Sequence, residues 1–157
     1  MPKLLVPHAE KGCEIESSCP MSLFVDTSIW YAAADSSDRS NARAKAILAS
    51  GETLVTTDHV LVETWTLIHH RLQPNAAERF WQGLRSGVAA IEPVGLADLE
   101  AAWQIGVSWP GQDFSIVDRT SFAAMNRLGI ERAASLDNHF AVFRFGPKRR
   151  QSFIVVR

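Results

Sequence analysis

The sequence predicts an α/β protein built as a three-layer sandwich, in which helices cover both faces of a central, mainly parallel sheet of five strands. From residue 21 onward, short apolar runs alternate with stretches of helical period, which is the order of strand–helix–strand units. The first run, 22–25, lacks polar alternation and so predicts a strand buried on both faces. A chain of 157 residues with 46% hydrophobic residues fits one domain with a substantial core.

The first half of the chain predicts two strands and four helices. Asp26-Thr27-Ser28 leads from the first strand into a helix, and Thr57 or Asp58 is suited to cap the third helix. Apolar residues recur on one face of that third helix until Pro74 ends or interrupts it. The expected elements are strands over 22–25 and 53–56, and helices over 29–34, 41–49, 58–72 and 75–86.

The second half predicts three strands and two helices. Ser115 is a candidate cap for a helix that runs to Leu128, and Gly129 suits the left-handed position after its end. Gly146-Pro147 forms a turn before the last strand. The expected elements are strands over 88–93, 132–136 and 153–156, and helices over 96–108 and 116–128, with a loop over 109–112.

The composition excludes several classes of protein. A net charge of -1 and a pI of about 6.5 argue against a globally basic nucleic-acid coat protein. The two cysteines, Cys13 and Cys19, are too few and too close together for a disulfide-stapled secreted fold. No apolar run approaches the roughly 20 residues that span a bilayer. We therefore expect a soluble, cytoplasmic protein.

Four acidic residues occupy telling positions. Asp26 and Asp137 each follow a predicted strand, Asp118 lies in the first turn of a helix, and Glu63 is the sole charge in an apolar helical stretch. Each has an ordinary alternative. Asp26 can cap a helix, Asp118 can form a capping box with Ser115, Glu63 can sit in a structural ion pair and Asp137 can belong to a plain turn.

The four acids taken together are stronger evidence for a functional site than any one of them alone. In a parallel sheet the carboxyl ends of the strands meet at one edge, where ligands bind, so these side chains can converge. Two like charges ~4 Å apart cost on the order of 4 kcal/mol at an effective dielectric of about 20, so such a cluster needs cations or bound protons. Oxygen-rich acidic sites suit Mg²⁺ or Mn²⁺.

Short motifs surround the four acids. They are Phe24-Val25-Asp26-Thr27-Ser28, Val62-Glu63, Phe114-Ser115-Ile116-Val117-Asp118 and Leu136-Asp137-Asn138-His139-Phe140. In this order and spacing, which covers essentially residues 21–157, they resemble the acidic signature of PIN-domain ribonucleases. Within that class they are most similar to the VapC-type toxins of bacterial toxin–antitoxin pairs.

The resemblance implies an acidic pocket that holds one or two divalent ions, Mg²⁺ or Mn²⁺, and cleaves RNA endonucleolytically. It also implies a small protein antitoxin as a partner and a homodimer. By the same resemblance, the catalytic and metal-holding residues are Asp26, Glu63, Asp118 and Asp137, with Thr27, Ser28 and Asp113 in support. For Asp113 the alternative is a charge at a helix start. The rival hypothesis for the whole chain is a catalytically inactive α/β module whose acidic pocket only binds a metal or a protein.

Basic residues near the C-terminus are candidates for contacts with RNA phosphates, which would have to come from local patches in a chain of this charge. The alternative is a solvated turn before the last strand. The candidates are Arg119, Arg144, Lys148, Arg149 and Arg150.

Residues 1–20 mix prolines, charges and both cysteines without a helical or strand period, so we interpret them as an N-terminal extension to a nuclease domain over 21–157. Deleting them is expected to leave folding and activity intact, because periodic structure begins only after Met21. Thermal melting of the truncated and full-length chains checks this. A large drop in the melting temperature of the shorter chain would show that the extension is structural.

Overall fold

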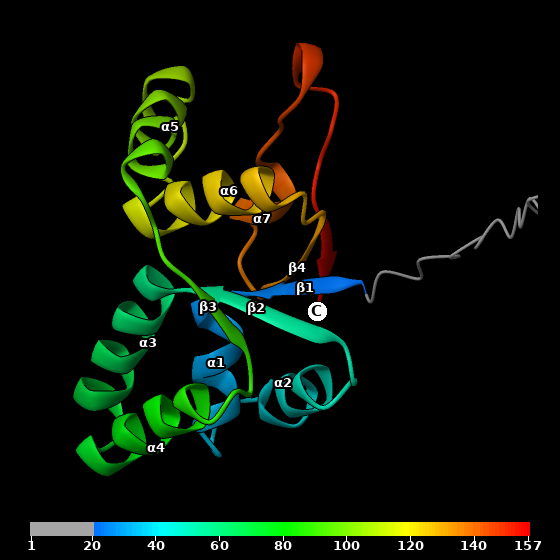
Figure 1. Cartoon of the computed structure of the whole chain (residues 1–157). Helices are drawn as coiled ribbons and strands as arrows, with labels where there is room; N and C mark the ends of the chain where they lie inside the picture. The colour runs from blue at the N-terminus through cyan, green and yellow to red at the C-terminus, as the bar shows by residue number, and fades with distance from the viewer. Residues whose placement is uncertain (1–20) are drawn as a thin grey trace, which may run out of the picture.

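In the computed structural model, residues 21–157 are described and form a three-layer α/β/α sandwich (Figure 1). The predicted extension over 1–20 lies outside the described residues. Five strands form one sheet in the order β3-β2-β1-β4-β5, and every neighbouring pair is parallel. The strands are β1 (Ser22–Val25), β2 (Thr53–Thr57), β3 (Ala90–Glu92), β4 (Arg132–Ala134) and β5 (Ile154–Val156). The predicted fold class is confirmed, with a sheet that is wholly rather than mainly parallel.

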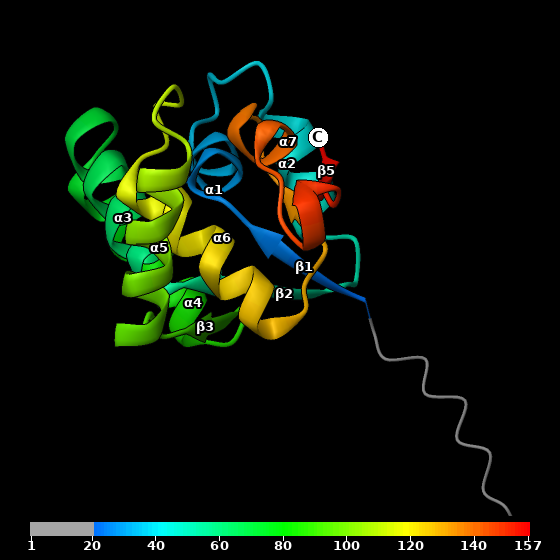
Figure 2. The same ribbon diagram turned by 90° about the horizontal axis from the view of Figure 1, so that it is seen from above.

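Helices cover both faces of this sheet. One layer contains α1 to α4 and the opposite layer contains α5 to α7 (Figure 1), and Figure 2 views the molecule from the side of the second layer. The helices are α1 (Thr27–Ala34), α2 (Asn41–Leu48), α3 (Asp58–Arg71), α4 (Pro74–Arg85), α5 (Leu96–Ser108), α6 (Ile116–Leu128) and α7 (His139–Val142), with a 3₁₀ turn, η1 (Pro147–Arg149). Within residues 21–157, none of these helices has the length and apolarity to cross a membrane.

The central strand β1 is the most deeply buried part of the sheet. Leu23, Phe24 and Val25 are fully buried because helices cover the strand on both sides. The Phe24 ring lies 6.1 Å from the ring of Phe140 in α7, at the edge of a cluster of phenylalanines. This packing fixes the carboxyl end of β1, and with it the residue that follows, Asp26.

The order of the strands reverses next to β1. The chain passes from β1 to β2 and β3 on one side, then returns to place β4 and β5 on the other. Connections that leave β1 and β4 therefore run to opposite faces, which opens a crevice at their carboxyl ends. Asp26 follows β1, and Ser135 to Asp137 follow β4, so the topology itself brings them to this crevice.

Several local predictions are confirmed and a few are corrected. Gly129 has the expected left-handed conformation, with φ of 67° after α6. Pro74 begins α4 rather than only ending α3, since the first helical position needs no backbone N–H. The strand predicted over 132–136 ends at Ala134, because the chain turns at Ser135. The short α7 and η1 were not predicted, since neither is long enough to show a helical period.

Candidate active site

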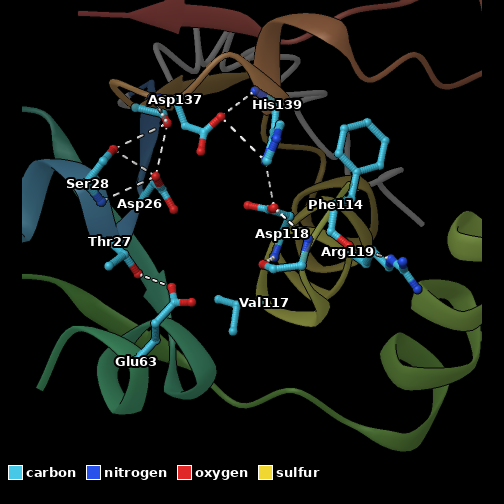
Figure 3. A network of polar contacts seen from close by, with 12 residues as sticks. Asp26, Thr27, Ser28, Glu63, Phe114, Val117, Asp118, Arg119, Asp137 and His139 are labelled. Carbon is cyan, nitrogen blue, oxygen red and sulfur yellow. Dashed lines mark hydrogen bonds and ion pairs between the residues drawn. The ribbon is translucent and has the colours of Figure 1, made fainter. Parts of the chain in front are cut away.

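A pocket of about 460 Å³ lies at the carboxyl ends of β1 and β4, and all four predicted acids line it. Figure 3 shows their carboxylates pointing toward one space from separate elements: the end of β1, α3, the start of α6 and the turn before α7. The other lining residues are Thr27, Ser28, Tyr31, Asp38, Leu67, Ser115, Leu136 and His139. The convergence expected at this edge of the sheet is thus present.

Asp26 is the most buried of the four acids, with 6% of its surface exposed. It caps α1, and its Oδ2 accepts hydrogen bonds from Ser28 N at 3.3 Å, Ser28 Oγ at 2.8 Å and Ser135 Oγ at 3.0 Å. Burial raises the pKa of Asp26 to about 6, although these hydrogen bonds act in the opposite direction, and the nearby charge of Asp118 adds to the rise. Asp26 is therefore both a helix cap and a pocket acid.

Glu63 projects from α3, whose start is capped by the Thr57 hydroxyl. Its Oε2 accepts a hydrogen bond of 2.6 Å from Thr27 Oγ1, the residue that follows Asp26. No cation within residues 21–157 forms an ion pair with Glu63. The structural ion pair considered as its alternative is absent from the described part of the chain, and the Thr27 hydroxyl ties Glu63 to the pocket instead.

Asp118 forms the capping box that its spacing from Ser115 predicts. Asp118 N donates to Ser115 Oγ at 3.0 Å, and Ser115 N donates to Asp118 Oδ2 at 2.8 Å. The same Oδ2 lies 2.8 Å from His139 Nδ1. The cap and the pocket position are compatible, because the capping contacts use only one of the two carboxylate oxygens.

Asp137 lies in a tight turn between β4 and α7. Its Oδ1 accepts a hydrogen bond of 2.8 Å from His139 N, an Asx-type turn, and its own N–H donates to Ser135 Oγ at 3.0 Å. The turn alternative is thus correct as local structure, and the turn also directs the carboxylate into the pocket (Figure 3).

The four carboxylates share one pattern: each has one oxygen bound by the protein's own donors and one oxygen facing the pocket without a donor. Within residues 21–157, no hydrogen bond or ion pair reaches the second oxygens, which are Asp26 Oδ1, Glu63 Oε1, Asp118 Oδ1 and Asp137 Oδ2. Four carboxylate oxygens gathered at one pocket without a donor from the chain are available as ligands for a cation.

This donor set suits a hard divalent ion. The free ligands are all oxygens, and such ligands favour Mg²⁺ or Mn²⁺ over softer metals. In the described part of the chain, no three His, Cys, Asp or Glu side chains are close enough together to hold one ion directly. That spacing still fits Mg²⁺, which commonly keeps several waters and binds through one or two carboxylates.

Other predicted residues lie away from the pocket. Asp113 is exposed in the loop before α6 and is not among the pocket-lining residues. Arg119 Nε donates to Phe114 O at 2.9 Å, and its side chain points away from the carboxylates (Figure 3). Arg144 Nη1 donates to the carbonyls at the end of α7, including Ala141 O at 2.6 Å. The exposed cations of the basic set are Lys148, Arg149 and Arg150.

Sequence reasoning missed two residues that shape the pocket. Ser135 bonds Asp26 through its hydroxyl, and His139 contacts Asp118 and Asp137 through its ring. Only their positions in the sequence could have indicated them: Ser135 lies two residues before Asp137 and His139 two residues after it. Such spacing became informative only once the turn around Asp137 was known.

The fold and this acidic pocket define a known class, and the chain belongs to the PIN domain family, whose model matches residues 23–146. Over 125 residues, which are 78% of this chain and 95% of the relative, it is 40% identical to the protein named 23S rRNA-specific endonuclease VapC20 of Mycobacterium tuberculosis. The chain is therefore a homologue of a VapC toxin.

Solved structures agree with this relationship. The crystal structure of M. tuberculosis VapC20, described as a sarcin–ricin loop cleaving toxin, matches with a TM-score of 0.72 and 37% identity over 76% of this chain and 92% of that one. Rickettsia felis VapBC2, bound to a DNA fragment from its promoter, matches with a TM-score of 0.58 and 12% identity over 75% of this chain and 89% of that one. The second match supports the fold alone.

Replacing Asp26 by Asn is expected to stabilise the metal-free protein at neutral pH. A carboxyl whose pKa rises from 3.8 to about 6 on folding contributes stability that is fully present below pH 3.8 and is lost as the pH rises through 6. The loss is on the order of 3 kcal/mol. In EDTA, the melting temperature of Asp26→Asn should therefore exceed that of the original protein by an amount that grows from pH 4.5 to 7.5.

The exposed acid Glu131 provides the matched control. For Glu131→Gln, the difference from the original protein should not follow the same pH course. A helix-cap role alone for Asp26 predicts no such growth with pH. A constant difference across the range for Asp26→Asn would therefore contradict the buried-charge interpretation.

Proposed function

We propose that this chain is a metal-dependent endoribonuclease that hydrolyses RNA phosphodiesters and acts as the toxin of a toxin–antitoxin pair in the cytoplasm. The observation that carries the proposal is the set of four carboxylates with one free oxygen each around a single pocket. Homology to a protein named as a 23S rRNA-specific endonuclease supports RNA as the substrate. Because the related VapC20 is described as a sarcin–ricin loop cleaving toxin, that loop is the first defined RNA to test.

The residues of the pocket have distinct tasks in this proposal. Asp26, Glu63, Asp118 and Asp137 would hold Mg²⁺ or Mn²⁺, with one or two carboxylates bound to an ion directly and the others through water. When bound, the ion supplies positive charge that offsets the phosphodiester's charge and makes water more acidic. Ser28 and Ser135 keep Asp26 in place, and Thr27 does the same for Glu63. In this proposal the nucleophile is water rather than a side chain, and no covalent bond forms between an acid and the substrate.

An antitoxin partner follows from the same proposal. Other structures of this fold carry names of toxin–antitoxin complexes, such as VapBC2. An arginine from the partner would fit the pocket, because its planar guanidinium can bind carboxylate oxygens in pairs. This arginine would bind the same carboxylate oxygens as the metal. The antitoxin and the metal would then compete for the pocket.

The resemblance to the family also implies a homodimer, and one face of α5 is a candidate for the contact between its two subunits. Leu96, Leu99, Trp103 and Val107 lie on one face of this helix, and Trp103 and Val107 are 66% and 60% exposed. A contiguous apolar face of this kind is typical of an interaction surface. We propose this face as the contact between two copies.

Asp26→Asn and Glu63→Gln are expected to abolish metal-dependent cleavage, with rates lowered at least about a hundredfold, since each removes a charge that holds the ion. The assay incubates pure protein with total RNA and with a synthetic sarcin–ricin stem-loop, with Mg²⁺, Mn²⁺ or EDTA, and maps new 5′ ends. Glu131→Gln is the control and should cleave like the original protein. If the original protein binds Mn²⁺ but leaves every RNA intact, the rival hypothesis of a binding module replaces the nuclease.

Lys148 and Arg150 are the exposed cations proposed to contact RNA phosphates. Neither has an acidic partner within residues 21–157, whereas Arg149 lies over Trp109, with its guanidinium carbon 4.9 Å from the ring centroid. Contacts of this kind compensate for an acidic pocket that repels the RNA backbone.

Replacing both Lys148 and Arg150 by Ala is expected to reduce the salt dependence of RNA binding. Each lost phosphate contact on a single strand lowers the slope of log K against log[salt] by about 0.7. Binding is measured in the cleavage-deficient Asp26→Asn background. The control replaces the exposed pair Arg43 and Lys45 on α2, in the opposite layer, and should keep the original slope. Equal slopes for both double variants would exclude the predicted contacts.

A further inference from the structure

His139 joins two of the four acids of the pocket. Its Nδ1 lies 2.8 Å from Asp118 Oδ2 and 3.4 Å from Asp137 Oδ1, and Figure 3 shows the ring between the two carboxylates. The two acids come from different elements, the start of α6 and the turn before α7. The imidazole is therefore a direct link between two walls of the pocket.

The two neighbours of Nδ1 determine where the ring carries its hydrogen. Both are carboxylate oxygens, and an ionised carboxylate only accepts hydrogen bonds, so the tautomer that satisfies both contacts carries its hydrogen on Nδ1. A neutral imidazole can carry its hydrogen on Nδ1 just as the imidazolium does. The link therefore does not require a charged histidine. At 2.8 Å the stronger hydrogen bond is the one to Asp118.

The ring is held well enough to impose an orientation on its partners. His139 is the first residue of α7, and its backbone N–H donates to Asp137 Oδ1 at 2.8 Å. The ring packs edge-on against Phe114, at 5.4 Å between centroids and an interplanar angle of 79°. Phe114 is itself buried in the core. Main chain and ring are thus both fixed, although the side chain still lines the pocket.

The fixed position of the His139 ring restricts the orientation of the Asp118 carboxylate. Its Oδ2 accepts from Ser115 N and from His139 Nδ1, and these two donors together fix the plane of the carboxylate with Oδ1 toward the pocket. A single donor on Oδ2 restrains rotation of the carboxylate about its last bond less than two donors from different directions do. We propose that His139 is a positioning residue of the nuclease site, which holds Asp118 and Asp137 so that their free oxygens face the ion and the RNA. This inference rests on the proposed function.

Two substitutions of His139 distinguish the role of its hydrogen-bond donor from the role of the imidazole ring. In His139→Asn, the amide nitrogen stands as many bonds from Cβ as Nδ1 does, so it can keep the hydrogen bond to Asp118. In His139→Gln, the amide nitrogen lies one bond farther out. We expect His139→Gln to lower kcat on the sarcin–ricin stem-loop with Mn²⁺ by about tenfold to a hundredfold, with little change in KM, since misplaced groups slow the reaction by this much. His139→Asn should recover most of the lost rate.

A second readout does not depend on cleavage. Mn²⁺ raises the melting temperature of a protein that binds it only when folded. This rise should be smaller for His139→Gln than for the original protein and for His139→Asn. His59→Gln is the matched control, because His59 Nδ1 also contacts α6, at 3.2 Å from Thr120 Oγ1, but His59 does not line the pocket. It should change neither readout.

The possible results distinguish a failure of this inference from a failure of the proposed function. Cleavage and Mn²⁺ response in His139→Gln equal to those of the original protein would overturn the inference. So would a His139→Asn variant as slow as His139→Gln, because the ring itself would then be required, as in proton transfer. If the original protein leaves both the stem-loop and total RNA intact, that result counts against the proposed function. The Mn²⁺ melts then still decide whether His139 positions the acids.

Discussion

The burial of negative charge at the end of the central strand is the constraint on which the rest of this structure depends. Asp26 follows three fully buried residues of β1 and is itself almost fully buried, without a cationic partner in the described part of the chain. Such a carboxylate is costly unless it is hydrogen-bonded or protonated, or binds a cation. The hydroxyls of Ser28 and Ser135 meet part of this cost, and the raised pKa of Asp26 shows that part remains.

The other three acids follow the same pattern: one carboxylate oxygen accepts a hydrogen bond from the protein, and the other has no donor in the described part of the chain. Two of the donors are local in sequence: the N–H of Ser115 at the start of α6 for Asp118, and the N–H of His139 in the turn for Asp137. The donor to Glu63 is the hydroxyl of Thr27, which comes from a different helix, α1. The contacts to Asp118 and Asp137 cap a helix and close a turn, so the same hydrogen bonds serve the fold and orient the carboxylates. Replacing Asp26 by Asn is therefore expected to raise the stability of the metal-free protein and to lower the proposed metal-dependent activity.

The sequence alone predicted the fold class and the four acids that line the pocket. The buried run before Asp26, the apolar surroundings of Glu63 and the spacing of Ser115 from Asp118 are local patterns, and local patterns are what a sequence shows. Charge and composition could not place the basic residues, because a side chain near the pocket in sequence can point elsewhere. Arg119 reaches back to Phe114 O and Arg144 closes the end of α7.

Only the tertiary structure decided which side chains meet. The capping and pocket alternatives for Asp26 and Asp118 could not be separated by sequence, and they prove compatible because a carboxylate has two oxygens. Sequence reasoning did not find His139, because its partner Asp118 lies in a different helix and the two side chains meet only when α6 and α7 pack together. What the sequence determined was the chemistry available at one edge of a sheet. What the fold decided was the direction of each oxygen, because orientation is set by long-range packing rather than by neighbours in the chain.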